Sequence, residues 1–381
     1  MKQVAYYKGK EQTYVKHFFL ERYLEAVAFH IGYSHREFVY VDCFSGPWRA
    51  DDEELADTSI RIALDKLNYV LRGLTKLNRT PPIRAIFIER QPKAFSALQT
   101  ALEQHRHAVT TIPLQGTFEN NIPAILERVG NSFAFCFIDP TGWSGFAMDE
   151  ISPLLCHQPG EVMVNFMWDF INRFINFPEE ANERSLDRFF GTPDWRHIRT
   201  LAAAERETAS LELYQEQLRK TGGFTYVTST RILKPQSDRA YFHLVYATRN
   251  SKGIFKFRDV EKKTYSEQNS VRENAQREHR ETKSGQSELF FGPVERPSQL
   301  TEEERTRRLR QARDLIYAIL RRGPARYEEL QPRVLELPLV WNEDFKAMLL
   351  EGREEGLIVI NGMKKGERTP KAGHVIRLVR S

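Results

Sequence analysis

The sequence predicts an α/β protein whose main domain is built on a Rossmann-like parallel sheet. Apolar runs of strand length alternate with amphipathic segments between residues 38 and 166, which is typical of parallel strands joined by right-handed helical crossovers. Three of the apolar runs end at an acidic residue, namely Asp42, Glu89 and Asp139. Because ligands bind at the carboxyl edge of such sheets, these acids indicate a nucleotide-type cofactor site.

Length and composition predict two domains in a soluble protein. The chain has 381 residues, of which 41% are hydrophobic and 28% are charged, and no apolar run approaches the ~20 residues that span a bilayer. The polar start of the chain lacks the apolar core of a secretion signal, so we expect a cytoplasmic protein without a membrane partner. The expected domains are 1–260 and 301–381, joined by a polar, charged segment over 261–300 that is typical of a solvated linker or an extended surface helix.

The first domain is predicted from its hydrophobic periodicity. Apolar residues at helical spacing over 11–30, including Phe18, Phe19 and Tyr23, predict an amphipathic helix before the first strand. The strands expected next are 38–41, 84–88, 109–114, 133–138 and 161–166, and the helices between them are 60–74, 92–105, 122–128 and 148–155.

A hairpin is expected to close this sheet. The apolar runs 224–232 and 241–248 are joined by a polar turn at 235–238, and a helix over 201–220 precedes them. Class I methyltransferases have five parallel strands that finish in an antiparallel hairpin, whereas dinucleotide dehydrogenases usually continue in parallel. The expected topology therefore favours methyl transfer.

The C-terminal segment predicts a winged-helix domain. Thr301 and Glu304 match a capping box at the start of a helix, two shorter helices follow at about 327–335 and 343–355, and strands at 357–360 and 374–379 flank a basic, glycine-rich loop. From residue 301 onward there are 17 lysines and arginines against 13 acidic residues, which accounts for +4 of the net charge of +5.

The basic loop is a candidate nucleic-acid contact. It carries Lys364, Lys365, Arg368 and Lys371, which suit phosphate groups. The alternative is a winged helix that contacts proteins, because the predicted third helix is rich in acidic residues, which are unfavourable next to phosphates.

The turn after the first strand is the first candidate cofactor element. Gly46 allows the backbone to approach a ligand closely, and the candidate cofactor residues in this turn are Asp42, Phe44, Ser45, Gly46 and Pro47. The alternative is an ordinary strand-to-helix turn. Cys43 lies in the same segment, and we interpret it as a small packed residue rather than a nucleophile.

The ends of the second and third strands supply further cofactor candidates. Glu89, followed by Arg90, occupies the position where an acid accepts hydrogen bonds from ribose hydroxyls; the alternative is a solvated surface acid. Thr117 and Phe118 follow the third strand, and Phe118 is a candidate neighbour for an adenine ring.

The segment after the fourth strand is the candidate acceptor site. The carboxylate of Asp139 and the nearby carbonyl of Pro140 can accept hydrogen bonds from an exocyclic amine and orient its lone pair toward an electrophilic methyl group. Trp143 is a candidate for stacking on a base, and Asn165 follows on the next strand. The alternative is that Pro140 to Gly142 only turns the chain and that Trp143 belongs to the core.

Five collinear motifs resemble the three-Cys-motif partner (TcmP) family of class I S-adenosylmethionine-dependent methyltransferase-like proteins. They are YVDCFSGP at 40–47, FIE at 87–89, FIDPTGW at 137–143, VNF at 164–166 and ATRNSKG at 247–253. The resemblance implies S-adenosyl-L-methionine as cofactor and a three-Cys-motif partner protein. It also implies that Asp42 and Gly46 lie by the methionine end of the cofactor, Glu89 by its ribose and Asp139 by the acceptor.

We therefore expect an S-adenosylmethionine-dependent methyltransferase that modifies an amine of a nucleic-acid base. The alternative is a catalytically inactive nucleic-acid-binding or scaffolding protein, because Trp48 stands where the family has a glycine and its bulk would narrow the cofactor loop. A metal-dependent nuclease using Asp42, Glu89 and Asp139 is disfavoured because no nuclease spacing joins these acids. No metal is expected, since the three cysteines are far apart.

Overall fold

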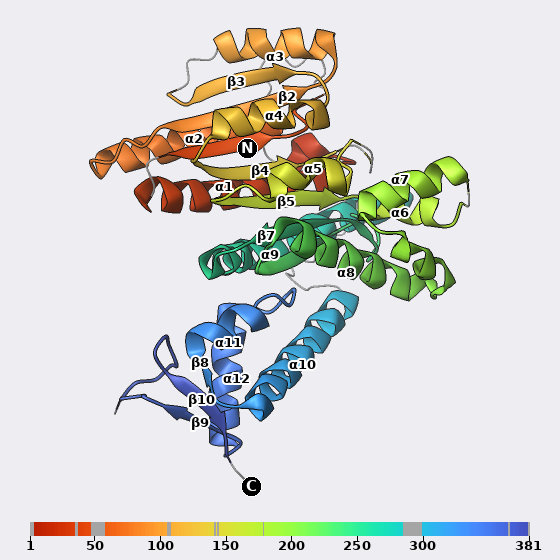
Figure 1. The fold of residues 1–381 in the computed structure, drawn as a ribbon. Helices are drawn as coiled ribbons and strands as arrows, with labels where there is room; N and C mark the ends of the chain where they lie inside the picture. The colour runs from red at the N-terminus through yellow and green to blue at the C-terminus, as the bar shows by residue number, and fades with distance from the viewer. Residues whose placement is uncertain are drawn as a thin grey trace. The chain divides into compact units, whose positions relative to one another are not determined.

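The computed structural model describes residues 4–34, 37–46, 58–104, 108–140, 142, 145–177, 179–284, 299–364 and 366–379. The chain forms two compact units, drawn in Figure 1. The N-terminal unit comprises Met1–Val227 and Arg231–Arg249, and the C-terminal unit comprises Thr228–Thr230 and Asn250–Ser381. The division thus falls after Arg249, earlier than the domain end predicted at residue 260.

A seven-stranded sheet forms the centre of the N-terminal unit. Its strand order is β3-β2-β1-β4-β5-β7-β6; β1 to β5 pair in parallel, and β7 pairs antiparallel with β5. The mixed sheet fits a Rossmann-like methyltransferase fold, as predicted. The strands are β1 (Phe38–Asp42), β2 (Ile83–Glu89), β3 (Thr110–Gln115), β4 (Phe133–Ile138), β5 (Gly160–Phe166), β6 (Tyr226–Leu233) and β7 (Ala240–Thr248).

The strand order positions the site. β1 pairs with β2 on one side and with β4 on the other. From β1 the chain adds β2 and β3 toward one edge of the sheet, and it then returns to add β4 and β5 toward the other edge. Ligands bind in the crevice outside the carboxyl ends of the strands at such a switch point. Asp42 ends β1, Glu89 ends β2 and Asp139 follows β4, so all three predicted acids lie along this edge.

Helices cover both faces of the sheet. Val39 and Val41 of β1 face a core built with α4, α5, α7 and α8, whereas Tyr40 faces the other side, where Tyr23 of α1 and Tyr40 both contact Phe135. The helices of this unit are α1 (Glu11–Ser34), α2 (Ser59–Lys76), α3 (Pro92–Gln104), α4 (Phe118–Val129), α5 (Met148–Leu155), α6 (Trp168–Ile175), α7 (Glu180–Phe190) and α8 (Ala203–Gly222), with 3-10 helices η1 (Val4–Tyr7) and η2 (Pro193–Thr200).

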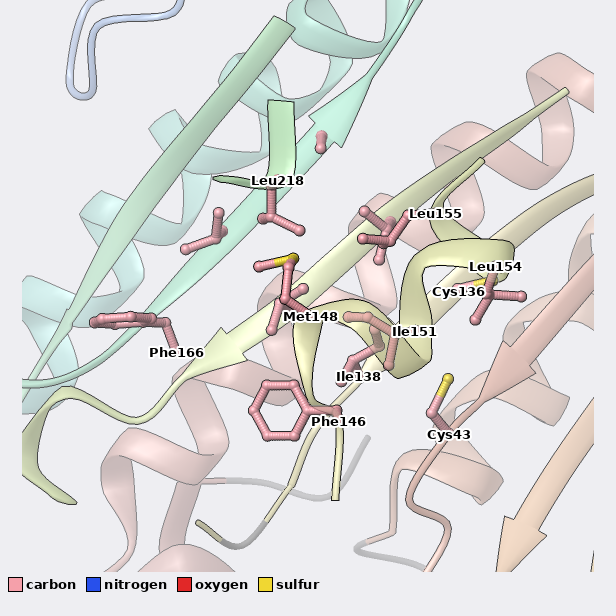
Figure 2. Close-up of a cluster of buried hydrophobic side chains, with 14 of the residues drawn as sticks. Cys43, Cys136, Ile138, Phe146, Met148, Ile151, Leu154, Leu155, Phe166 and Leu218 are labelled. Carbon is pink, nitrogen blue, oxygen red and sulfur yellow. The ribbon is translucent and has the colours of Figure 1, made fainter. Parts of the chain in front are cut away.

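The first of these faces forms a continuous apolar core. Figure 2 shows Cys43 and Cys136 among its members, beside Ile138 and Ile151. Burial raises the pKa of the Cys43 thiol well above its usual range and that of Cys136 to about 12. Because the thiolate is the nucleophilic form, a thiol held protonated in this way is a packing residue.

The C-terminal unit contains a three-stranded antiparallel sheet in the order β8-β10-β9. The predicted helices near 327–335 and 343–355 and the strands near 357–360 and 374–379 are present, and β8 is additional. The elements are α9 (Ser251–Ser284), α10 (Gln299–Arg322), β8 (Ala325–Arg326), α11 (Tyr327–Val334), α12 (Asn342–Glu354), β9 (Ile358–Asn361) and β10 (Val375–Leu378).

Residues 261–284, predicted as a solvated linker or an extended surface helix, are helical and continue α9, but one side of this helix is buried. Ile254, Phe257 and Val271 supply buried apolar positions along it, and buried polar residues such as Glu261 and Arg258 lie beside them. The polar composition concealed this buried side of the helix. Within the described parts of the chain, no helix is long and apolar enough to cross a membrane.

Candidate functional site

Asp42 organises the loop that follows β1. Its side chain is fully buried and accepts hydrogen bonds from the Ser59 hydroxyl (2.8 Å) and the Phe44 backbone N–H (3.3 Å). Burial, together with the nearby charge of Asp139, raises the pKa of Asp42 to about 6, while the hydrogen bonds act in the opposite direction. The predicted cofactor residue Asp42 therefore lies beneath the loop and ties it to the start of α2.

A first cavity of about 570 Å³ opens at the carboxyl ends of β1 to β4. We call it the Glu89 cavity. It brings together residues that the sequence placed around a cofactor, and its lining includes Phe44, Gly46, Glu89, Arg90, Thr117 and Phe118. Three predicted cofactor residues, Asp42, Ser45 and Asp139, do not line it; Ser45 and Asp139 line a second cavity instead. Ser45 is buried, and its hydroxyl instead accepts a hydrogen bond from the Ile88 N–H (3.1 Å) and donates one to the Asp42 carbonyl (3.0 Å).

Glu89 lies almost completely buried in the wall of this cavity, with 5% of the residue exposed. One carboxylate oxygen, Oε1, accepts a hydrogen bond from the Gln91 backbone N–H at 2.5 Å. The other, Oε2, lies directly over Gly46, where an added Cβ atom would come within 1.7 Å of it. Only glycine leaves room for this carboxylate, so Gly46 and Glu89 form one structural feature.

The wall after β3 is held by backbone geometry and capping. Gly116 has a φ of 125°, a conformation that L side chains rarely adopt. Thr117 caps α4 by accepting a hydrogen bond from the Asn120 N–H (3.4 Å). Phe118 is 2% exposed and lies 5.5 Å from the ring of Phe44, so most of the ring is core and its edge borders the cavity.

A second cavity of about 380 Å³ lies beside the first. We call it the Asp139 cavity. Phe44, Gly46 and Pro140 line both cavities, so the two share one wall. Other residues that line the Asp139 cavity include Lys16, Asp139, Asn165, Phe170, Tyr241 and Phe242.

Asp139 is held from two sides. Its Oδ2 forms an ion pair with Lys16 Nζ at 2.5 Å, and its Oδ1 accepts a hydrogen bond from Asn165 Nδ2 at 2.6 Å. Asn165 Nδ2 also contacts the Met167 sulfur at 3.2 Å. Asn165 Oδ1 is buried and has no hydrogen-bond partner in the described structure.

Lys16 was not predicted as a site residue. It belongs to α1, 123 residues away from Asp139 in the sequence, and no local motif joins the two. The only sequence feature that could have indicated a role for Lys16 is its position within the apolar stretch that contains Val15, Phe18 and Phe19.

The neighbouring His17 does not add a second cation. It is 5% exposed, and Nδ1 lies 3.1 Å from the Tyr7 hydroxyl. Burial and the charge of Lys16 lower the pKa of His17 to about 3, although Asp139 acts in the opposite direction. The imidazole is therefore neutral near pH 7, and Lys16 supplies the positive charge on this wall.

The aromatic run after β5 divides between the core and the cavity. Phe166 and Trp168 belong to the buried core, whereas Phe170 lines the Asp139 cavity with Tyr241 and Phe242 of β7. The aromatic candidate Trp143 lies outside the described residues, as do Pro47 and Trp48 in the first loop and Lys365 in the basic loop.

The basic loop of the C-terminal unit is organised around Glu367. This carboxylate accepts a hydrogen bond from the Lys364 backbone N–H at 3.0 Å and pairs with Lys371 and His374. The Lys371 hydrogen bond is the largest factor that lowers the pKa of Glu367 to about 2. Lys364 and Arg368 are exposed, and no ion pair is seen for either within the part of the chain that the structure describes.

The described residues contain no group of three His, Cys, Asp or Glu side chains that could hold a metal ion. Asp42, Glu89 and Asp139 therefore form no such cluster there, although they share one edge of the sheet.

Comparisons with known proteins identify similar folds only. No protein-family model matches the chain, and no curated protein matches it. Among solved structures it is similar to cofactor-bound Rv0187 from MTB, with 12% identity over 60% of this chain and 79% of that chain and a TM-score of 0.31. At such a TM-score the similarity carries no functional argument.

Two further solved structures are similar at the same level. Protein LPL1258 from Legionella pneumophila is 11% identical over 62% of this chain and 84% of that chain, with a TM-score of 0.33. A loganic acid methyltransferase with SAH is 10% identical over 74% of this chain and 92% of that chain, with a TM-score of 0.30.

Proposed function

We propose that this protein is an S-adenosylmethionine-dependent methyltransferase that acts on an amine of a nucleic-acid base. The observation that carries the proposal is the shared wall of the two cavities, formed by Phe44, Gly46 and Pro140 at the switch point of the sheet. One cavity has the buried carboxylate of Glu89 and the other has the partly buried carboxylate of Asp139. This arrangement suits two ligands that must meet at one point.

The residues of the Glu89 cavity fit an adenosyl cofactor. The volume of about 570 Å³ lies within the range of small-molecule sites. Glu89 ends β2, where a carboxylate accepts strong hydrogen bonds from ribose hydroxyls, and Phe118 offers an apolar edge for the adenine ring. When bound, the cofactor supplies a methyl group activated by an adjacent sulfonium centre.

The Asp139 cavity fits a planar acceptor. Phe170, Tyr241 and Phe242 provide aromatic surface, on which bases stack. The Asp139–Asn165 pair lies in the same lining and supplies polar groups for an exocyclic amine. Transfer to such an amine depends chiefly on orientation, because the nitrogen already carries a lone pair. The nitrogen would form its bond to the methyl carbon as the methyl–sulfur bond breaks to leave S-adenosylhomocysteine, and the proton of the amine would pass to solvent.

The C-terminal unit supports the choice of nucleic acid. We propose that its part from α10 onward is a winged helix, because the elements there follow the order helix, strand, helix, helix, strand, strand. Lys364 and Arg368, which are exposed, are proposed to contact phosphates. Lys371 is paired with Glu367, and we expect it to contribute less.

The motifs also support a proposal of family and partner. We propose that the chain belongs to the TcmP family and binds a three-Cys-motif partner protein, on the basis of its five collinear motifs. Co-purification of the chain with such a partner tests this part separately from catalysis, and its absence would contradict the proposed partner.

Transfer of a labelled methyl group tests the proposed activity. The purified protein is incubated with methyl-labelled S-adenosylmethionine and mixed-sequence single-stranded DNA and RNA. We expect label in one nucleic acid and no label with Asp139→Ala, whose cofactor affinity should remain nearly unchanged. Absence of label in nucleic acid despite cofactor binding would contradict the substrate assignment, and absence of cofactor binding would favour the scaffolding alternative.

A further inference from the structure

The orientation of the Asn165 amide is fixed by its neighbours. Nδ2 donates to Asp139 Oδ1 at 2.6 Å, and Asp139 is in turn the salt-bridge partner of Lys16 at 2.5 Å. An ionised carboxylate can only accept hydrogen bonds. A flipped amide would place its own carbonyl oxygen against the carboxylate, which is repulsive. Asn165 therefore keeps Nδ2 on the Asp139 side and Oδ1 on the side away from Asp139.

Asn165 Oδ1 and Lys16 Nζ both have hydrogen-bonding capacity left over. Oδ1 is buried without a partner in the described structure, and a buried acceptor without a partner is costly. The Lys16 ammonium has three donors. One faces Asp139, and no other hydrogen bond of this ammonium is seen among the described residues. Both side chains line the Asp139 cavity.

We propose that Lys16, Asp139 and Asn165 act as a relay that selects the amino edge of adenine or cytosine. In this arrangement Asn165 Oδ1 accepts a hydrogen bond from the exocyclic amine and Lys16 donates one to the adjacent ring nitrogen. The inference rests on the proposed function of the cavity as the acceptor site. It goes further by naming the base edge and by making Asn165 the direct contact of the amine.

The relay disfavours the corresponding oxo bases. Uracil and hypoxanthine present a carbonyl oxygen and a ring N–H, the reverse of the pattern in cytosine and adenine. Their carbonyl would meet Asn165 Oδ1, and Asp139 prevents the amide flip that would relieve this repulsion. Asp139 is therefore a positioning residue that acts through Asn165.

Nucleoside binding tests the relay without requiring methyl transfer. Ligand-observed NMR measures cytidine and uridine affinities of the full chain, first alone and then with saturating S-adenosylhomocysteine. Cytidine and uridine are the probes because adenosine can enter the Glu89 cavity. Each good paired contact to a base edge discriminates by about tenfold, and we expect cytidine to bind at least that much more tightly than uridine.

Three variants separate positioning from direct contact. Asp139→Asn frees the Asn165 amide to flip, so uridine should bind more tightly and the preference should disappear. Asn165→Leu should weaken cytidine binding about tenfold. Lys16→Met should also remove the preference. Lys66→Met is the matched control, because Lys66 forms an ion pair with Glu25 at 2.7 Å and lines neither cavity.

The wild-type measurement alone can overturn the inference, whether or not the variants fold. Equal affinity for the two nucleosides, tighter uridine binding, or no binding of either would do so, as would a cytidine preference that survives in folded Asp139→Asn. If cytidine is preferred but S-adenosylhomocysteine does not bind, the relay is supported and the proposed methyltransferase function fails. The two failures are thus distinguishable.

Discussion

Gly46 and Glu89 are in such close contact that Glu89 Oε2 occupies the space a Cβ atom of residue 46 would need, 1.7 Å from its ideal position. The two residues come from different strand ends, and both line the proposed cofactor cavity. The absence of a side chain at residue 46 therefore sets the position of the carboxylate proposed to bind the ribose.

The first prediction concerns this contact. Gly46→Ala should push the Glu89 carboxylate away from its site and lower cofactor affinity by at least about tenfold, the loss expected when one charge-assisted hydrogen bond is broken. Titration calorimetry with S-adenosylhomocysteine measures the effect. Gly73→Ala on α2 is the control, since an added Cβ there meets only Phe29 at an ordinary 3.4 Å. Undiminished affinity in Gly46→Ala would refute the proposed coupling.

The second prediction concerns Glu89 itself. Glu89→Ala removes the acceptor for the ribose hydroxyls and should weaken cofactor binding by about 1–3 kcal/mol, the range for hydrogen bonds to charged groups. Glu103→Ala, an exposed residue of α3, should have no effect in the same titration. Wild-type affinity in Glu89→Ala would remove the ribose assignment.

The third prediction follows from the burial of Asp42, which raises its pKa from 3.8 to about 6. Between about pH 3.8 and pH 6, Asp42 is therefore protonated in the folded protein but ionised in the unfolded chain. The stability contributed by this protonation is fully present below pH 3.8 and is lost as the pH rises through about 6.

Comparison with Asp42→Asn isolates this contribution. The free energy of unfolding of the wild type, relative to that of Asp42→Asn, should fall by about 3 kcal/mol between acidic and neutral pH. Urea denaturation at a series of pH values provides the measurement. A difference that stays constant with pH would show that Asp42 has the same proton affinity in both states.

The fourth prediction concerns the interior of the C-terminal unit. Arg258 and Glu261 form an ion pair at 2.7 Å with both side chains 1% exposed, and Glu261 also accepts a hydrogen bond from the Trp341 indole N–H at 3.3 Å. Arg258→Met leaves the Glu261 charge buried and unpaired, which should destabilise this unit by about 3–5 kcal/mol.

Denaturation of the variant is followed by circular dichroism. Lys262→Met is a matched control, because Lys262 is 47% exposed in its ion pair with Glu343, and exposed pairs contribute at most about 1 kcal/mol. Equal effects of the two substitutions would contradict the importance assigned to the buried pair.

Much of the fold was predictable because apolar runs with distinct periods specify strands and helices locally. The runs ending at Asp42, Glu89 and Ile138 are buried strands of one sheet, and sheet topology then brings their ends together. Helix α9 was predicted less well. Its polar residues include Arg258 and Glu261, whose burial depends on tertiary partners that no local pattern reveals.

The site was predictable only where it follows the strand ends. Asp139 directly follows β4 and Asn165 lies near the end of the neighbouring parallel strand β5, so their proximity could be predicted from the sequence. Lys16 comes from α1, and its contact with Asp139 depends on how that helix packs on the sheet. Asp42 shows a second limit: the sequence gives its position on the edge of the sheet but not the inward direction of its side chain.

The most direct test of the central claim is calorimetric titration of the wild-type protein with S-adenosylhomocysteine, alongside Glu89→Ala. The account predicts saturable binding at one site in the wild type and weaker binding in the variant. Absence of binding in the folded wild type, or equal binding by both proteins, would contradict the assignment of the Glu89 cavity to the cofactor.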